Sequence, residues 1–336
     1  MTLPVFINTA PDIAIASPDN GHQRCIGLPI HFSGSAVDPE DGEISLSGTL
    51  QWRSDRDGQI GTGNGFSTAH LSQGTHTIAP TATDSMDGAA SASIQLVVHP
   101  PLLSDTGQTV STTSRPGEDS DYTSHPPSFS NNGDGTVTDN LTGLLWQQSD
   151  DGVTRPYTVA AYEYAGTVSI GAYSNWRLPT KKELLRIANF GRENPAMDTT
   201  VFPATKNACY WTQTGCTGQA EHVWAVDFTT GSVSAAPDYT SCYVRLVHGE
   251  KNTEPADLVD NGDGTVTDRT TGLMWQGGEG SCCSGWLGAL SHCEDSTLAG
   301  YTDWRLPNIK ELESIVDALE YDPAIDTAFF DGTLSR

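Results

Sequence analysis

The sequence has little positive charge and no long apolar run. Its 336 residues include 17 lysines and arginines against 42 aspartates and glutamates, so the net charge is −25. A surface this acidic repels phosphate backbones and anionic lipid headgroups, which argues against nucleic-acid and membrane-surface partners. Because no run of about 18 apolar residues occurs, no membrane insertion is expected. Solubility is the simpler explanation of the acidity, and cation binding is the alternative.

Catalytic signatures are also missing. The sequence contains no Gly-x-Ser-x-Gly, no His-Glu-x-x-His and no phosphate-binding loop. Its nine histidines are scattered, and we expect His222 and His248 at the surface or at strand edges. Carboxylate pairs are no guide in so acidic a chain. We therefore predict no catalytic residue, no cofactor and no enzymatic activity.

The first residues do not resemble a signal peptide. Residues 1–7, Met-Thr-Leu-Pro-Val-Phe-Ile, lack a basic segment and an adequate apolar core. Abundant Gly, Thr, Ser and Asp are nevertheless typical of β-rich secreted modules with many turns. We expect an extracellular or cell-surface protein. Either the export signal has been removed or the numbered chain is part of a longer product.

The seven cysteines favour disulfides over a metal cluster. They form no Cys-x-x-Cys pair and no convincing Cys-His zinc spacing. Cys209 and Cys242 each precede a strand-like run and are the preferred bridge, with Cys216–Cys242 as the alternative.

The other cysteines leave the second bridge open. Cys293 has two candidate partners, Cys282 and Cys283, and we favour Cys283. The odd count leaves at least one cysteine free or intermolecular, for which Cys25 is a candidate.

One stretch of the chain occurs twice. Asn-Gly-Asp-Gly-Thr-Val-Thr-Asp spans residues 132–139 and again residues 261–268, and Thr-Gly-Leu-Leu/Met-Trp-Gln follows at 142–147 and 271–276. A Gly/Asp turn, a β-branched strand, a second turn and a return strand predict a hairpin. Trp-Arg-Leu-Pro and Lys-Glu-Leu then recur in the same order, so the chain holds two copies of one domain.

Residues 8–100 are expected to form a separate all-β sandwich of the immunoglobulin-like type. Short apolar runs alternate with acidic turns there, at 13–16, 30–33, 50–53, 76–79 and 94–98. The turn Asp-Pro-Glu-Asp-Gly at 38–42 and the segments 52–58 and 74–84 resemble bacterial immunoglobulin-like modules of surface proteins. That resemblance implies a spacer or stalk.

Residues 102–250 form the first copy of the repeated domain, with an expected α+β fold. After the hairpin we predict a short helix over 157–164 and a second helix capped by Thr180, with Glu183 completing a capping box. Arg177 is expected to bond loop carbonyls or an acid. An antiparallel meander should follow, formed by the runs 210–212, 223–228, 232–234 and 243–247.

Residues 251–336 form the second copy, which is incomplete. It repeats the hairpin and both helices, with Asn308 and Glu311 as the capping pair, but it has no counterpart of residues 209–248. Either the numbered chain stops short of the gene product, or a neighbouring chain supplies strands.

The repeated motifs resemble the DUF1566 family, the C-terminal domain type of the Legionella collagen-like adhesin. The resemblance rests on the duplicated hairpin, on Trp-Arg-Leu-Pro at 176–179 and 304–307, and on Lys-Glu-Leu at 182–184 and 310–312. Members often begin with segments like 105–109 and 117–119, so residues 102–128 are assigned to the first copy. The resemblance implies a C-type-lectin-like fold in an exported bacterial protein.

The family resemblance also suggests a function. We expect a non-enzymatic adhesion or ligand-binding protein whose partner is an extracellular polymer or protein. The alternative is a structural subunit of a filament or sheath, which binds copies of itself by strand completion. The name-giving adhesin binds sulfated glycans, but this acidic chain has no obvious basic cleft for them. A formylglycine-generating type of enzyme is disfavoured, because the paired-cysteine site is absent.

The duplicated turns raise the question of calcium. Hard oxygens lie at near-alternate positions around glycines, as calcium requires. The candidate ligands are Asn132, Asp134, Asp139, Asn261, Asp263 and Asp268. The simpler interpretation is a turn whose side chains bond local N–H groups. The tryptophans are expected in the core, and loops 213–221 and 235–241 are the better candidates for a ligand surface.

Overall fold

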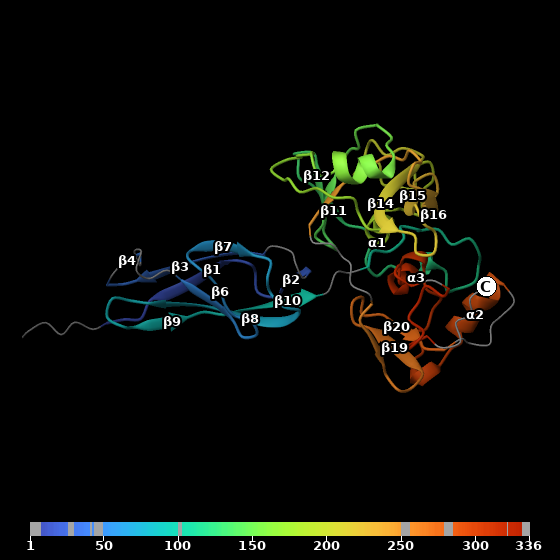
Figure 1. Cartoon of the computed structure of the whole chain (residues 1–336). Coiled ribbons are helices and arrows are strands. Elements are labelled where there is room, and N and C mark those ends of the chain that lie inside the picture. The colour runs from blue at the N-terminus through green and yellow to red at the C-terminus, as the bar shows by residue number, and fades with distance from the viewer. Residues whose placement is uncertain are drawn as a thin grey trace, which may run out of the picture. The chain divides into compact units, whose positions relative to one another are not determined.

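The chain is divided into two compact units, which are described separately. The computed structural model describes residues 8–25, 30–40, 42–43, 50–99, 103–249, 256–278, 285–320 and 322–330. Unit 1 is Met1–Pro101 and unit 2 is Leu102–Arg336 (Figure 1). Among the helices in these ranges, none has the length and apolar character needed to cross a bilayer.

Unit 1 consists of strands in two sheets. The strands are β1 (Asp12–Ser17), β2 (His22–Cys25), β3 (Ile30–Asp38), β4 (Gly42–Glu43), β5 (Gln51–Ser54), β6 (Gly58–Thr62), β7 (Gly65–Thr68), β8 (Gly74–Thr83), β9 (Ala89–Ser91) and β10 (Ile94–His99). One sheet has the order β1–β3–β4, with β7 also on β3. The other has the order β2–β10–β8–β5–β6, with β9 on β8. The β2–β10 pair is parallel and the other pairs are antiparallel.

The period-two pattern of the sequence accounts for the core of unit 1. Along β8, alternate residues from His76 to Ala82 are buried, as expected for a strand with one face inward. Phe32 and Trp52 are fully buried and belong to the same apolar cluster. The five runs predicted as strands all lie in or overlap strands of unit 1, so the β-rich prediction for this unit is confirmed.

The first copy in unit 2 begins with the predicted hairpin. Its elements are η1 (Asp119–Asp121), β11 (Phe129–Asn131), β12 (Thr136–Asp139), β13 (Leu145–Gln147), η2 (Val159–Tyr164), α1 (Lys181–Arg186), β14 (Cys209–Gly215), β15 (His222–Asp227), β16 (Ser232–Pro237) and β17 (Val247–His248). The strands form two sheets, β11–β12–β13–β17 and β14–β15–β16. The Thr180 side chain accepts from the Glu183 amide at 3.1 Å, so the capping box at the start of α1 is confirmed.

The second copy repeats the first as far as its second helix. Its elements are β18 (Leu258–Asp260), β19 (Thr265–Asp268), β20 (Met274–Gln276), α2 (Trp286–Glu294), η3 (Leu298–Gly300) and α3 (Ile309–Ile315). Val266 pairs with Trp275, as Val137 pairs with Trp146 in the first copy. Asn308 and Glu311 form the expected capping box of α3. Within the described residues 256–278, 285–320 and 322–330, no strand corresponds to β14–β17.

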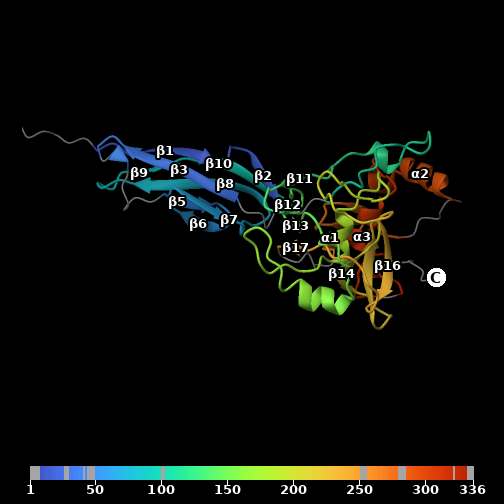
Figure 2. The ribbon, with the colours of Figure 1, turned by 90° about the horizontal axis from the view of Figure 1, so that it is seen from above.

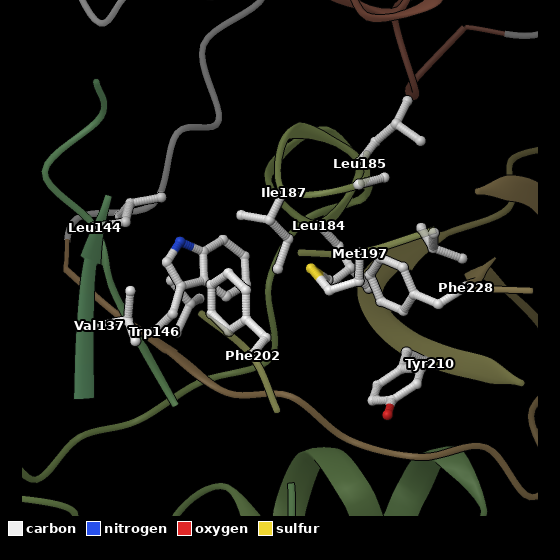
Figure 3. Packing of buried hydrophobic residues seen from close by; sticks show 13 residues of the cluster. Val137, Leu144, Trp146, Leu184, Leu185, Ile187, Met197, Phe202, Tyr210 and Phe228 are labelled. Atoms are coloured by element: carbon white, nitrogen blue, oxygen red, sulfur yellow. The ribbon is translucent and has the colours of Figure 1, made fainter. Parts of the chain in front are cut away.

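The core of the first copy joins the hairpin, the helix and the meander. Figure 3 shows the Trp146 and Phe202 rings beside each other, with Leu184 of α1 and Ile187, the residue after that helix, close to Met197. Of the tryptophans predicted to lie in the core, Trp146, Trp176 and Trp211 are buried, whereas Trp224, Trp275 and Trp304 are half-buried, so the prediction is confirmed only in part. The apolar face of α1 therefore rests on both sheets.

The last run of the predicted meander, residues 243–247, is shared between two sheets. Tyr243 forms a parallel bridge with Tyr210 of β14, whereas Val247 pairs with Trp146 of β13. The prediction that the whole run extends the antiparallel meander was therefore wrong. Arg245 lies between these two pairings. Its fully buried guanidinium donates to the carbonyls of Gln147 and Gln148, both at 2.7 Å, and these carbonyls follow β13. The same guanidinium donates to Thr205 Oγ1 at 2.9 Å and lies 3.7 Å from the Asp150 carboxylate, so this buried cation has both acceptors and a counter-charge.

Candidate functional site

The duplicated turns use their polar side chains locally. Asp134 Oδ1 accepts from the Thr136 amide at 3.0 Å and from its hydroxyl at 2.6 Å, and Asp263 binds Thr265 in the same way. Asn132 donates to Thr136 and Thr138, and Asn261 donates to Thr265 and Thr267. These bonds hold the tight turn, and the Thr136 side-chain bond is the main reason why the pKa of Asp134 is lowered.

The remaining two calcium candidates lie deeper. Asp139 and Asp268 are buried, and each accepts a backbone N–H and a threonine hydroxyl of its own second turn. Burial lowers the pKa of Arg186, and the negative charges of these two carboxylates oppose that shift. In the described part of the chain, no three His, Cys, Asp or Glu side chains converge as metal ligands. The positive charge near these two acids is therefore supplied by a side chain of the protein, Arg186.

The arginine of the Trp-Arg-Leu-Pro motif binds the glutamate in the first turn of the helix that follows. Arg177 donates to both carboxylate oxygens of Glu183 at 2.8 Å, and its Nε donates to the Gly249 carbonyl at 3.2 Å. Arg305 binds both oxygens of Glu311 in the second copy. The prediction that these arginines bond an acid or loop carbonyls is confirmed. Glu183 and Glu311 also cap their helices, so each pair ties a motif loop to a helix start.

The structure contains the Cys209–Cys242 disulfide, with 5.1 Å between the Cα atoms. Cys216 carries a free thiol, so the alternative Cys216–Cys242 pairing is wrong. Cys282 and Cys283 lie outside the described residues, as does the side chain of Cys25, so the proposed Cys283–Cys293 bridge stays a prediction.

The two copies pack through equivalent helices. Figure 2 shows α1 and α3 side by side, and the contact is reciprocal. Lys182 Nζ on α1 donates to the Ser314 carbonyl near the end of α3, at 2.9 Å. Lys310 Nζ on α3 donates to the Arg186 carbonyl at the end of α1, at 2.7 Å. Each lysine thereby caps the C-terminal end of the other copy's helix, where an ammonium group is favoured.

Lys310 is the more deeply buried of these two lysines. Its Nζ also donates to Ser104 Oγ at 3.1 Å and to the Asp105 carbonyl at 2.9 Å. Burial lowers the pKa of Lys310 to about 7. This interface was not predicted from the sequence, although its two lysines are the lysines of the repeated Lys-Glu-Leu motif.

Residues 103–128, which precede the first hairpin, contact both copies. Ser104 donates to the Arg186 carbonyl of the first copy. Tyr122 donates to Glu294 of α2, and Arg115 donates to Ser291 of the same helix. The sequence assigned residues 102–128 to the first copy, but residues of this segment also bind the second copy.

A groove opens on the second copy between β20 and α3. Its volume is about 580 Å³, and its lining includes Met274, Trp275, Trp304, Leu312, Ile315 and Phe330. β20 pairs with β19 on one side, and no strand of the described residues pairs with its other edge. This groove therefore combines apolar walls with an open sheet edge.

The loops of the first copy form a second exposed surface. The Asp238 amide donates to the Glu221 carbonyl at 2.8 Å, and the Tyr157 amide donates to the Asp238 carbonyl at 2.8 Å, so both predicted loops meet the start of η2. Tyr162 on η2 is 78% exposed and Tyr239 is 75% exposed. Thr217, at the other end of the first loop, donates to the Ala318 carbonyl of the second copy. Only part of loop 213–221 is thus open to a ligand.

Comparison with known proteins identifies a family match. The model of the Lcl C-terminal domain matches residues 135–248 and 264–336, more than half of the chain. Among solved structures, the fibronectin(III)-like modules of Clostridium thermocellum CbhA match at 22% identity with a TM-score of 0.24. That match covers 27% of this chain and 47% of the other, so the chain spans less than half of that structure's length. No curated protein matches.

Proposed function

Because the chain belongs to the family of the Lcl C-terminal domain, we propose that it is a non-enzymatic, extracellular or cell-surface protein of a bacterium that adheres to a polymer or protein ligand. The observation that carries this proposal is the match of both copies to a domain of adhesin type. Residues 8–100 serve as an immunoglobulin-like spacer, and two sheets around one shared core support that role. Each copy has a C-type-lectin-like fold, of which the second contributes only its opening part.

The ligand surface lies on the first copy, around Tyr162 and Tyr239. Exposed tyrosines present a flat apolar face and a hydroxyl, a combination that suits stacking on sugar rings. The adjoining carbonyls and acids of residues 219–221 and 238–240 supply hydrogen-bond partners. Since the net charge is −25, a neutral or cationic ligand fits this surface better than a sulfated one.

A glycan and matrix-protein array tests the proposal. The full chain should bind one or more neutral polysaccharides or proteins, and the double variant Tyr162→Ala/Tyr239→Ala should lose at least about tenfold in affinity. Tyr173→Ala is the matched control, because Tyr173 is also exposed but lies outside loops 213–221 and 235–241 and outside the groove of the second copy. Equal binding by the double variant would refute the assignment of the surface, and no binding at all would refute the adhesin.

A second candidate is a structural subunit of a filament or sheath. One edge of β20 is paired with no strand among the described residues, and this favours the subunit, because an open edge is a template for a strand from another molecule. Light scattering across a concentration series separates the two candidates. A subunit forms species larger than one chain as concentration rises, whereas an adhesin of this type stays monodisperse.

A further inference from the structure

The groove of the second copy lies where the first copy holds its own chain. In the first copy, residues 246–249 run between β13 and the Trp-Arg-Leu-Pro motif. The amide of Gln147 donates to the Leu246 carbonyl at 2.9 Å, and the Val247 and Arg177 backbones exchange two bonds of 2.9 and 3.0 Å. This segment is therefore paired on both of its edges. In the described residues of the second copy, β20 and Arg305 have no such strand between them.

The groove is lined by residues whose counterparts are buried in the first copy, where the hairpin, α1, the meander and residues 246–249 close around them. Leu184 is 0% exposed in the first copy, whereas its counterpart Leu312 is 48% exposed. Gln147 is buried, and its Oε1 accepts from the Leu246 amide at 3.1 Å, whereas the equivalent Gln276 is exposed. The difference lies in the missing cover, because the two copies share the residues beneath it.

We propose that this groove is the docking site for an extended polypeptide strand with the chemistry of residues 243–249, which pairs antiparallel with β20. In the first copy, Val244, Leu246 and Val247 of that segment are completely buried, so the occupant carries aliphatic side chains on both faces. It also carries a cation, because Arg245 donates to the carbonyl of Gln147, whose counterpart is Gln276.

Charge supports the same occupant. Three charged side chains line the groove, Asp303, Arg305 and Glu311, and Arg305 pairs with Glu311. Asp303 leaves a negative charge, and the chain as a whole is strongly acidic. A strand with an arginine and a histidine, such as Arg245 and His248 in the first copy, complements this negative potential. The inference deepens the second candidate function, since it names the partner chemistry of the open edge. It does not depend on the ligand surface of the first copy.

A synthetic peptide provides the test. Tyr-Val-Arg-Leu-Val-His-Gly, the sequence of residues 243–249, carries a fluorophore and is titrated with the full chain. We expect saturable binding and slower amide hydrogen exchange in Met274–Gln276 when the peptide is bound. A peptide with aspartates in place of the residues at 246 and 247 should not bind, because it cannot fill the apolar walls.

Two leucine variants make the result specific. Leu312→Asp should weaken peptide binding at least about tenfold, since a buried leucine contact is replaced by a charge. Leu319→Asp should leave binding unchanged, because Leu319 is 84% exposed and lies outside the groove. Circular dichroism verifies that both variants fold.

Two outcomes would overturn the proposal. One is the absence of saturable binding at about 1 mM peptide, and the other is equal binding of the peptide to both leucine variants. Peptide binding by a chain that stays monomeric at all concentrations would support the groove and refute the filament. The two proposals can thus fail separately.

Discussion

Burial of Lys310 should make the stability of unit 2 rise with pH. The Lys310 ammonium group is enclosed by Ser104, Asp105 and Arg186, and burial is the main reason why its pKa falls from 10.5 to about 7. The negative charges of Asp139 and Asp105 oppose the shift. Between these two pKa values the unfolded chain binds more protons than the folded chain, so the free energy of unfolding increases with pH.

The size of the effect follows from the two pKa values. For a single lysine with these values, the linkage relation predicts a gain of about 2 kcal/mol between pH 7 and pH 9. Well below pH 7 both states hold the proton, and the contribution no longer changes. Lys310→Met removes the titrating group and hence the gain. The carbonyls of Asp105 and Arg186 also lose a donor in this variant, so the informative quantity is the change with pH rather than stability at one pH.

Urea denaturation of the full chain at pH 7 and pH 9 measures this quantity. Tryptophan fluorescence reports mainly on unit 2, since Trp52 is the only tryptophan before residue 102 in the sequence. The exposed Lys206 offers the control, and Lys206→Met should keep the wild-type gain. The reasoning is refuted if Lys310→Met gains as much stability as the wild type, or if the wild type gains nothing.

Three further predictions concern the core, the disulfide and the duplicated turns. Leu184→Ala should lower the free energy of unfolding by about 2–5 kcal/mol, while Leu312→Ala, at the equivalent but half-exposed position, should lower it by less than about 1 kcal/mol in urea denaturation. Cys209→Ser should cost about 2–4 kcal/mol by calorimetry, and a reducing agent should then have no further effect on this bridge. EDTA should leave the melting temperature unchanged, because Asp134 and Asp263 are engaged by threonines of their own turns; a rise on adding calcium would contradict this.

Short-range signals made much of the fold predictable. The hairpins, the two capping boxes and the Arg177–Glu183 pair each involve residues close in sequence, whose geometry follows from turn and helix chemistry. The Cys209–Cys242 bridge was preferred because each cysteine precedes a strand-like run, and in the structure residues 210 and 243 are bridged beside it. The family resemblance rests on the same local motifs.

Long-range contacts account for what the sequence did not predict. Strand propensity alone assigned residues 243–247 to the meander. In the structure Tyr243 bridges β14, Arg245 donates to the carbonyls after β13, and Val247 pairs with β13 itself. The contact of Lys310 with Arg186 joins residues 124 positions apart and depends on the packing of one copy on the other. Periodicity identifies the buried face of a helix without identifying what buries it.

In the second copy, the repeated residues that stabilise the fold differ from the exposed leucine of the groove. Arg305 and Glu311 need no covering strand, because they fix the start of α3 by themselves. Leu312 is different, since its exposed side chain adds little to the fold that carries it and leaves an apolar surface in contact with water. A polar residue at this position would therefore cost the isolated copy almost nothing. If Leu312→Asp leaves the free energy of unfolding within about 0.5 kcal/mol of wild type but abolishes strand binding, the groove walls serve an occupant rather than the core.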